Sequence, residues 1–120
     1  RAKELRRLPQ GIATQRAILS SYKKAAAGRG LSWGISDETF YSLLRLPCNY
    51  CGGLPSNVRK SHSGNGNFIY GGIDRKDNTK GYIEVNVVPC CKTCNKMKGT
   101  LSYDQFLAHL SKIIETSLKD

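Results

Sequence analysis

Helix-forming patterns dominate the first third of the chain. Strong helix formers predict a helix over 14–27, which ends where Gly28 interrupts the pattern. Ser36 is a good N-cap and two acidic residues follow it, so the sequence predicts a second helix from there to about Arg45. Pro47 lies just beyond and cannot continue a helix. The pattern therefore predicts two helices separated by a short extended piece.

The C-terminal region also predicts a helix. Ser102 and Gln105 form a capping-box pattern, in which each side chain bonds the backbone N–H of the other residue. Apolar residues then recur at helical spacing, and we interpret this stripe as part of the hydrophobic core rather than as a cofactor surface. The residues of the stripe are Phe106, Leu107, Leu110, Ile113, Ile114 and Leu118.

Between these helical regions the pattern changes to loops and strands. Residues 52–67 are rich in Gly, Ser and Asn and predict a loop. Apolar and β-branched residues predict strands over 68–73 and 82–88, which the turn residues 77–81 join into a hairpin. A short helix is predicted over 91–98. Helices at both ends, with a hairpin and a helix between them, predict the α+β class.

The length of 120 residues fits one compact domain. We divide it into a basic N-terminal helical region (1–46), a central region (47–100) and a C-terminal helix (101–120). A domain this small has a limited core, and such domains often gain stability from a metal or from disulfides. No apolar run is long enough to span a bilayer and no secretory pattern is present. We therefore expect an intracellular protein, in the cytoplasm or nucleus of the host cell, without a membrane partner.

The charge of the chain narrows the class of partner. The net charge is +10, from 19 Lys and Arg against 9 Asp and Glu. Much of the excess lies within residues 1–30, where Glu4 is the only acid. A one-sided basic block favours phosphate binding and therefore a nucleic-acid partner. The alternative is that the charge serves only solubility.

Five cysteines raise the question of metal binding. Cys48 and Cys51 form one Cys-x-x-Cys pair, and Cys91 and Cys94 form a second. Two such pairs supply the four thiolates of a closed tetrahedral Zn²⁺ site, which is structural because it leaves no position for a catalytic water. Cys90 lacks the two-residue spacing to Cys94, and we expect it to be a buried, small apolar side chain. Redox-active thiols and buried free thiols are the alternatives.

Oxygen-bearing side chains lie around the predicted hairpin. Asp74 falls at a strand end and Asn95 at the start of the following helix, where a carboxylate and an amide oxygen suit one Mg²⁺ or Mn²⁺ ion. Asp77 and Asn78 offer further oxygens, but we interpret them as ordinary turn residues. The basic side chains nearby, which we expect to bind phosphates, are Lys76, Lys92, Lys96 and Lys98.

The order of these residues resembles the core of the HNH (ββα-metal) endonucleases, especially zinc-stabilised members found in phages, viruses and mobile elements. An Asp at a strand end, an Asn in the hairpin and Cys-x-x-Cys-Asn leading into a helix carry the likeness, over about residues 46–100. The resemblance implies a ββα-metal core stapled by a four-cysteine zinc site and flanked by α-helices. It also implies that Asp74 and Asn95 bind the catalytic metal and that Asn86 braces the loop by bonding its backbone.

One position departs from the family pattern. Where the family usually has a general-base His directly after the metal-binding Asp, this chain has Arg75. Arg stays protonated at any working pH, so we expect it to clamp the scissile phosphate instead. The base is then a hydroxide held by the metal, or His62 from the preceding loop. His109, on the last helix, is predicted to be structural or exposed.

Two functions follow from these patterns. The first is a metal-dependent endonuclease that hydrolyses phosphodiester bonds of nucleic acid, most readily DNA, with structural Zn²⁺ and catalytic Mg²⁺ or Mn²⁺. The alternative is a non-catalytic, zinc-stabilised module that only binds nucleic acid, and the missing His is its best support. Both are compatible with a monomer or a homodimer.

Overall fold

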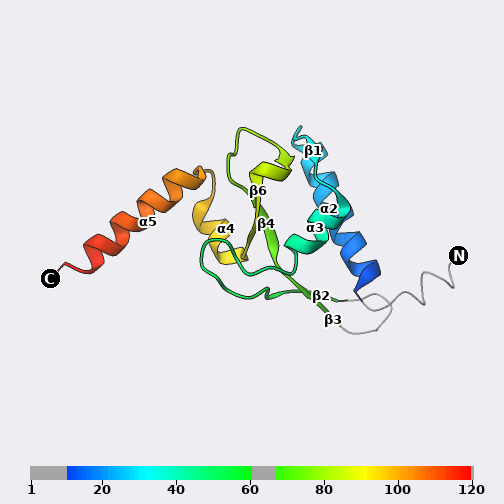
Figure 1. Cartoon of the computed structure of the whole chain (residues 1–120), viewed down its shortest axis with the longest axis horizontal. Helices are drawn as coiled ribbons and strands as arrows, with labels where there is room; N and C mark the ends of the chain where they lie inside the picture. The colour runs from blue at the N-terminus through cyan, green and yellow to red at the C-terminus, as the bar shows by residue number, and fades with distance from the viewer. Residues whose placement is uncertain (1–10, 61–66, 120) are drawn as a thin grey trace, which may run out of the picture.

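The computed structural model of the chain describes residues 11–60 and 67–119. The molecule is elongated, measuring 63 × 32 × 20 Å along its principal axes. Figure 1 shows two helices from the N-terminal third at one end, a hairpin and a short helix in the middle, and the C-terminal helix projecting at the other end. No described helix has the length and apolar character needed to cross a membrane.

The two N-terminal helices form where the pattern predicts them. Helix α2 covers Ile12–Gly28 and helix α3 covers Asp37–Leu43. The Ser36 hydroxyl accepts a hydrogen bond from the Thr39 N–H, which confirms the predicted N-cap. These helices supply much of the main core, whose buried members are Ile18, Leu19, Ala26, Ile35, Phe40, Leu44, Ile73, Tyr82 and Val87.

The strands differ from the prediction in number and in bounds. The segment predicted as a loop contains β2 (Asn57–Lys60), which pairs antiparallel with β3 (Asn67–Tyr70). The strand predicted over 68–73 is divided in two after β3. At that point the Gly71 N–H donates to the Leu44 carbonyl at 2.7 Å instead of to a neighbouring strand. A loop composition alone did not reveal the β2–β3 pairing, since each strand forms only against its partner.

The central hairpin is formed by β4 (Gly72–Arg75) and β6 (Val87–Cys90), which pair antiparallel with Asp74 opposite Val88. The strand predicted over 82–88 is instead β5 (Tyr82–Ile83), a 3₁₀-helix η1 (Glu84–Asn86) and the start of β6. Strand β5 pairs in parallel with β1 (Trp33–Gly34). This second pairing draws β5 toward the N-terminal helices and separates it from the hairpin.

Helix α4 (Lys92–Lys98) follows β6 directly and completes a ββα unit with β4 and β6. Cys91 is its N-cap, and its sulfur accepts a hydrogen bond from the Cys94 N–H at 3.3 Å. The molecule therefore has the predicted α+β class, with a ββα centre that carries a group of four cysteines and has α-helices on both sides (Figure 1).

The C-terminal helix α5 (Tyr103–Ser117) begins with the predicted capping box between Ser102 and Gln105. Our interpretation of its apolar stripe as core is wrong for four of its six members, since Phe106 is buried and Leu110 is half-buried but the others are exposed. Phe106 is 3% exposed, whereas Ile114 is 58% exposed. The reason is that α5 projects away from the rest of the molecule, so its far end has no described element beside it (Figure 1). The other exposed members of the stripe are Leu107, Ile113 and Leu118.

Candidate metal centre and adjoining cavity

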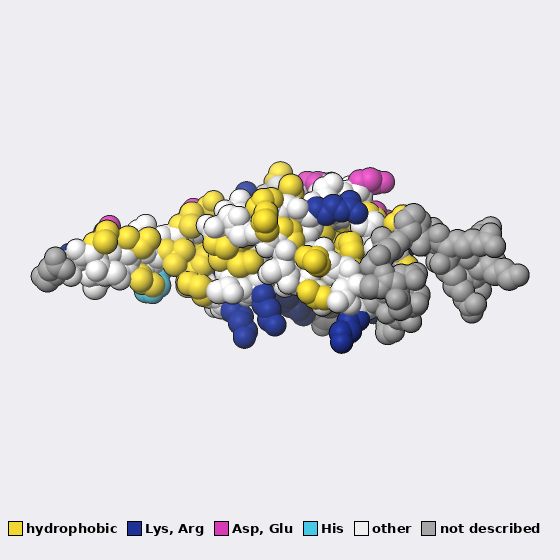
Figure 2. Space-filling model, turned by 90° about the horizontal axis from the view of Figure 1, so that it is seen from below, with side chains coloured by type: hydrophobic (Ala, Val, Ile, Leu, Met, Phe, Trp, Pro, Cys, Tyr) yellow, Lys and Arg dark blue, Asp and Glu magenta, His cyan; other side chains and the backbone are white. Residues whose placement is uncertain are grey.

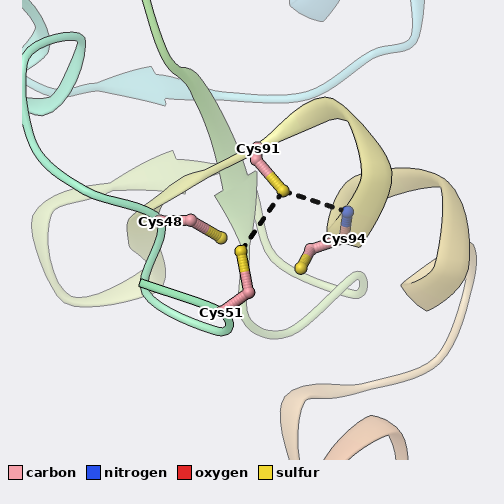
Figure 3. A group of neighbouring side chains, drawn as sticks. All are labelled: Cys48, Cys51, Cys91 and Cys94. Atoms are coloured by element: carbon pink, nitrogen blue, oxygen red, sulfur yellow. Dashed lines mark hydrogen bonds between the residues drawn. The ribbon is translucent and has the colours of Figure 1, made fainter. Parts of the chain in front are cut away.

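The four cysteines of the two Cys-x-x-Cys pairs converge on one point (Figure 3). Their sulfurs all lie within 4.8 Å of one another, and the Cys51 and Cys91 sulfurs are 3.7 Å apart. A tetrahedral zinc with Zn–S bonds of about 2.3 Å separates its sulfurs by about 3.8 Å. Four thiols at this spacing therefore form a group that fits a metal ion such as zinc.

The lowered pKa of Cys48 also suits metal binding. Burial raises the pKa of Cys48, but hydrogen bonds from the Cys51, Cys91 and Tyr50 backbone and from the Cys51 side chain outweigh it, and lower the pKa to about 6. A thiolate is the form that binds metals. Burial and the neighbouring sulfurs raise the pKa of Cys94, because one thiolate disfavours a second when no cation lies between them.

Cys90 stays outside this group, as predicted. Its side chain is 2% exposed, and its thiol donates a hydrogen bond to the Cys91 carbonyl at 3.3 Å. Burial raises the pKa of Cys90, and the negative charge of Asp74 adds to the increase. Because its sulfur does not belong to the group of four, Cys90 behaves as a small buried side chain.

The loop between Cys48 and Cys51 is held against the central hairpin by its backbone. The Asn49 N–H donates to the Pro89 carbonyl at 2.8 Å. The Cys48 N–H and the Gly52 N–H close the turn on the Gly53 and Cys48 carbonyls, at 2.8 and 2.9 Å. The first pair of cysteines thus has a fixed position relative to β6 and to the second pair.

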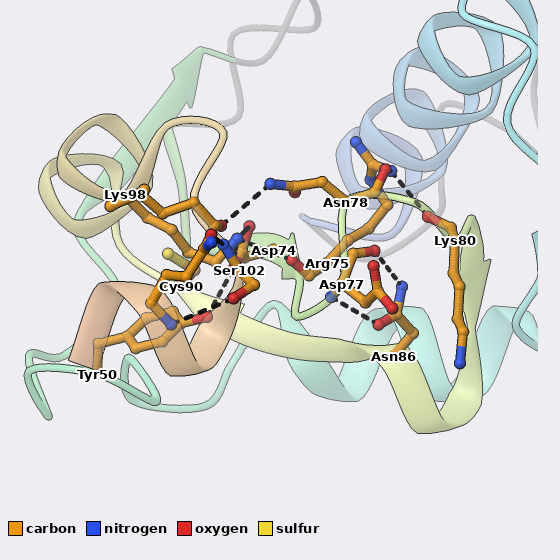
Figure 4. Close-up of polar contacts among 12 residues, drawn as sticks. Tyr50, Asp74, Arg75, Asp77, Asn78, Lys80, Asn86, Cys90, Lys98 and Ser102 are labelled. Carbon is orange, nitrogen blue, oxygen red and sulfur yellow. Dashed lines mark hydrogen bonds and ion pairs between the residues drawn. The ribbon is translucent and has the colours of Figure 1, made fainter. Parts of the chain in front are cut away.

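Asp74 lies at the centre of the ββα unit and is 7% exposed. The Tyr50 hydroxyl donates to its Oδ2 at 2.6 Å, and the Lys98 ammonium lies 3.4 Å from Oδ1 and 3.3 Å from Oδ2 (Figure 4). A carboxylate has about four lone-pair sites, so these contacts leave acceptor capacity for a further ligand. Sequence reasoning missed Tyr50, because nothing local indicates that a residue between two metal ligands reaches a strand 24 positions away.

Lys98 corrects one prediction. We expected it to bind phosphate, but it is 1% exposed and its ammonium also donates to the Arg75 carbonyl at 3.0 Å. A carboxylate that is nearly excluded from solvent needs a compensating charge, and the last turn of α4 supplies it. Lys98 is therefore an internal partner of Asp74 and is not available to nucleic acid.

Asp74 and Asn95 line one cavity of about 390 Å³ beside the ββα unit. Asn95 is exposed on α4, and its side chain forms no hydrogen bond with the described residues. One carboxylate oxygen and one amide oxygen beside a roomy polar cavity fit a hard cation such as Mg²⁺ or Mn²⁺, which keeps several waters or phosphate oxygens as ligands. The remaining lining residues are Tyr22, Arg29, Ile73, Arg75, Asn78, Tyr82, Gly99 and Thr100.

Two of these lining residues come from α2 and its C-cap and were not among the predicted site residues. The Tyr22 hydroxyl accepts a hydrogen bond from the Ile73 N–H at 3.3 Å, and burial raises the pKa of Tyr22 to about 12. Arg29 adds a positive charge to the rim of the cavity. The basic N-terminal block was the sequence signal for Arg29, but only the fold places it opposite α4.

Arg75 bonds the turn that follows β4 and also lines the cavity. Its Nη1 donates to the Asn78 and Lys80 carbonyls at 2.9 and 2.8 Å, and its guanidinium lies 5.6 Å from the centre of the Tyr82 ring. Its other nitrogens form no hydrogen bond with the described residues. The side chain braces the turn after β4 while leaving donors free for a phosphate in the cavity.

Asn86 braces the same turn from the other side, as the resemblance implied. Its Oδ1 accepts from the Asp77 N–H at 2.9 Å, and its Nδ2 donates to the Asp77 and Gly81 carbonyls at 3.1 and 2.9 Å. Asp77 is a turn residue rather than a metal ligand, because its Oδ1 accepts from the Thr79 N–H and hydroxyl at 2.9 and 2.6 Å. These bonds lower the pKa of Asp77.

The other predicted contacts to nucleic acid lie near the surface. Lys92 and Lys96 are exposed on α4, and Lys76 is half-buried with its ammonium 5.9 Å from the centre of the Tyr103 ring. In Figure 2, several of the Lys and Arg side chains in view project from the lower edge of the molecule. His109 is exposed on α5, which is one of the two predicted outcomes. His62 and the first ten residues lie outside the described residues.

Comparisons with known proteins agree with this geometry at the level of the fold. No protein-family profile matches the chain. Protein R423 of Acanthamoeba polyphaga mimivirus, described as uncharacterized, is 34% identical over 86 residues, which are 72% of this chain but 14% of that protein. The rare-cutting HNH restriction endonuclease PacI has a similar structure, with a TM-score of 0.58 and 20% identity over 86% of this chain and 78% of that one. The chain therefore has an HNH-like fold.

Proposed function

We propose that the protein is a metal-dependent endonuclease that hydrolyses phosphodiester bonds in DNA, built as a zinc-stabilised HNH domain. The observation that carries the proposal is the pairing of Asp74 and Asn95 on one cavity of an HNH-like ββα unit. The similar structure belongs to a restriction endonuclease described for its perturbation of DNA. DNA is therefore the first substrate to test.

The cavity residues divide the work as follows. Asp74 and Asn95 would hold a Mg²⁺ or Mn²⁺ ion, which when bound supplies a Lewis acid for the phosphate and the leaving 3′ oxygen. Arg75 donates hydrogen bonds to the phosphate from the nitrogens that the turn does not use. Asn86 fixes the turn that positions Arg75, so its effect on the reaction is indirect. Zinc at the four cysteines would hold the two loops together and take no part in the reaction.

Nucleic-acid binding is proposed to come from surface charge. The net charge is +10, and Lys92 and Lys96 stand exposed on the helix that carries Asn95. Arg29 adds a positive charge to the lining of the cavity, and Lys76 adds one directly after Arg75. Contacts of this kind neutralise phosphates and release counterions, so the affinity for DNA should fall steeply as salt rises.

One observation favours the non-catalytic alternative. Among the described residues that line the cavity there is no histidine, and Arg75 stays protonated. If the chain cleaves DNA, the proposed base is a hydroxide held by the metal or His62, which lies outside the described residues. A binding module would have the same zinc site, fold and basic surface but would leave the backbone of DNA intact.

A plasmid-cleavage assay separates the two. We expect cleavage with Mg²⁺ or Mn²⁺ and none with EDTA. Asn95→Ala removes an exposed side chain without a described structural bond, so we expect cleavage to fall on the order of 100-fold with unchanged DNA affinity by gel shift. Asp74→Asn, which keeps the shape of a buried partner of Lys98, should abolish cleavage.

Thr93→Ala is the matched control for Asn95→Ala, because Thr93 is exposed on α4 but does not line the cavity. It should cut like the wild type. Intact plasmid at every metal concentration, from protein that still shifts DNA, would establish the binding module instead.

A further inference from the structure

Tyr50 lies between the two cysteines of the first Cys-x-x-Cys pair. We propose that Tyr50 is a positioning residue that links the Cys48–Cys51 loop to the metal-binding carboxylate, by holding Asp74 in the orientation that binds the divalent cation. The proposal rests on the proposed function, because it assigns Asp74 to a metal. Tyr50 does not line the cavity, so it acts through Asp74 and not on the substrate.

The hydrogen bond that carries the proposal is short. The Tyr50 hydroxyl lies 2.6 Å from Asp74 Oδ2, the distance of a charge-assisted O–H···O⁻ bond. In this bond the tyrosine hydroxyl is the donor and the carboxylate oxygen is the acceptor.

The ring of Tyr50 packs against two aromatic rings of α5. Its centre lies 5.6 Å from that of Tyr103 and 5.3 Å from that of Phe106, both in the first turn of α5 (Figure 4 shows Tyr50 pointing to Asp74). Its backbone belongs to the loop that is tied to β6 through the bond from Asn49 to Pro89. The Cys48–Cys51 loop therefore positions the Tyr50 hydroxyl beside Asp74.

Asp74 needs such a partner because a carboxylate turns easily about its last torsion. The Lys98 ammonium does not fix that torsion, since it lies almost equally far from both oxygens, at 3.4 and 3.3 Å. Tyr50 bonds only Oδ2 and so distinguishes the two oxygens. Without the hydroxyl, Asp74 keeps its compensating charge but loses the bond that sets which lone pairs face the cavity.

The test replaces the hydroxyl alone. Tyr50→Phe in the full chain keeps the ring against Tyr103 and Phe106, and we expect its affinity for Mn²⁺, measured by electron paramagnetic resonance, to weaken about 10- to 100-fold. Bound zinc and DNA affinity should stay at wild-type values. Cleavage should fall at low Mn²⁺ and recover substantially as Mn²⁺ rises.

Tyr103→Phe is the matched control. It removes the hydroxyl of the ring packed against Tyr50, and that hydroxyl forms no hydrogen bond with the described residues. Mn²⁺ affinity should be unchanged in this variant. In an Asp74→Asn background, Tyr50→Phe should add no further loss of Mn²⁺ affinity.

Three results would overturn the proposal. The first is wild-type Mn²⁺ affinity in Tyr50→Phe. The second is loss of zinc from that variant, because the hydroxyl would then serve the Cys48–Cys51 loop rather than Asp74. The third is a loss of cleavage that no Mn²⁺ concentration restores, with Mn²⁺ affinity intact, because Tyr50 would then act on the substrate. Mn²⁺ binding by a wild-type protein that cuts no DNA would refute the nuclease function while leaving the Tyr50 comparison decisive.

Discussion

The ββα centre buries polar side chains, whereas the far end of α5 exposes apolar side chains to solvent. In the centre, charged and amide side chains are buried: Asp74 and Arg75 are each 7% exposed and Lys98 is 1% exposed. At the far end of α5, Ile114 is 58% exposed and Leu118 is 78% exposed. The usual rule that apolar residues lie inside and polar residues outside therefore fails at both places.

The two exceptions have different physical reasons. Each buried polar group of the centre has a partner of the right kind, such as Lys98 for Asp74 and the turn backbone for Asn86. The apolar residues at the far end of α5 are exposed and belong to neither core cluster of the described residues. Buried polar groups with fixed partners are typical of a site that binds a ligand or catalyses a reaction. The apolar stripe of α5 has the spacing of a helix face that packs on a core, but most of its residues are exposed.

Of the changes that test this comparison, metal removal should have the largest effect on the stability of the protein. Structural zinc contributes about 10–16 kcal/mol of apparent binding free energy in small zinc domains, comparable with the whole stability of a protein. We expect a strong chelator, or Cys94→Ser, to abolish cooperative thermal unfolding, measured by near-UV circular dichroism. Added zinc should restore the chelated wild type but not Cys94→Ser. A cooperative transition that survives zinc removal would show that the core of α2 and α3 holds the fold by itself.

Breaking the buried ion pair should have the next largest effect. Lys98→Met keeps the length of the side chain but leaves Asp74 buried without its ammonium, and losing one partner of a buried pair costs about 3–5 kcal/mol. Lys96→Met, on the exposed face of the same helix, should change stability by less than about 0.5 kcal/mol. Urea unfolding of both variants measures the difference. Equal midpoints would mean that Lys98 is exposed to solvent.

The smallest effect is expected on α5. Ile114→Ser removes an exposed apolar side chain, so the free energy of unfolding, measured in urea, should change by no more than about 0.5 kcal/mol. Phe106→Ala, which removes a ring buried against Tyr50 on the same helix, should cost about 3–5 kcal/mol. A cost above about 2 kcal/mol for Ile114→Ser would show that the stripe is covered in solution and would remove the contrast between the two regions.

Local signals predicted a large part of the fold and of the candidate site. The caps at Ser36 and Ser102 form as expected, because a cap depends on residues within one helical turn. The two Cys-x-x-Cys pairs converge, and Asp74 and Asn95 line one cavity. The strands were less predictable, because β2 and β3 exist only through pairing with each other.

The sequence by itself determined the chemical groups and their short-range geometry: the paired thiols, the helix caps, the turn residues and the order of carboxylate, amide and cysteines. Only the tertiary structure decided which groups meet across long separations. It set Tyr50 against Asp74, turned Lys98 inward and left α5 uncovered. The reason is physical: spacing along a helix or a turn follows from backbone geometry, whereas burial and charge compensation depend on which distant segments pack together.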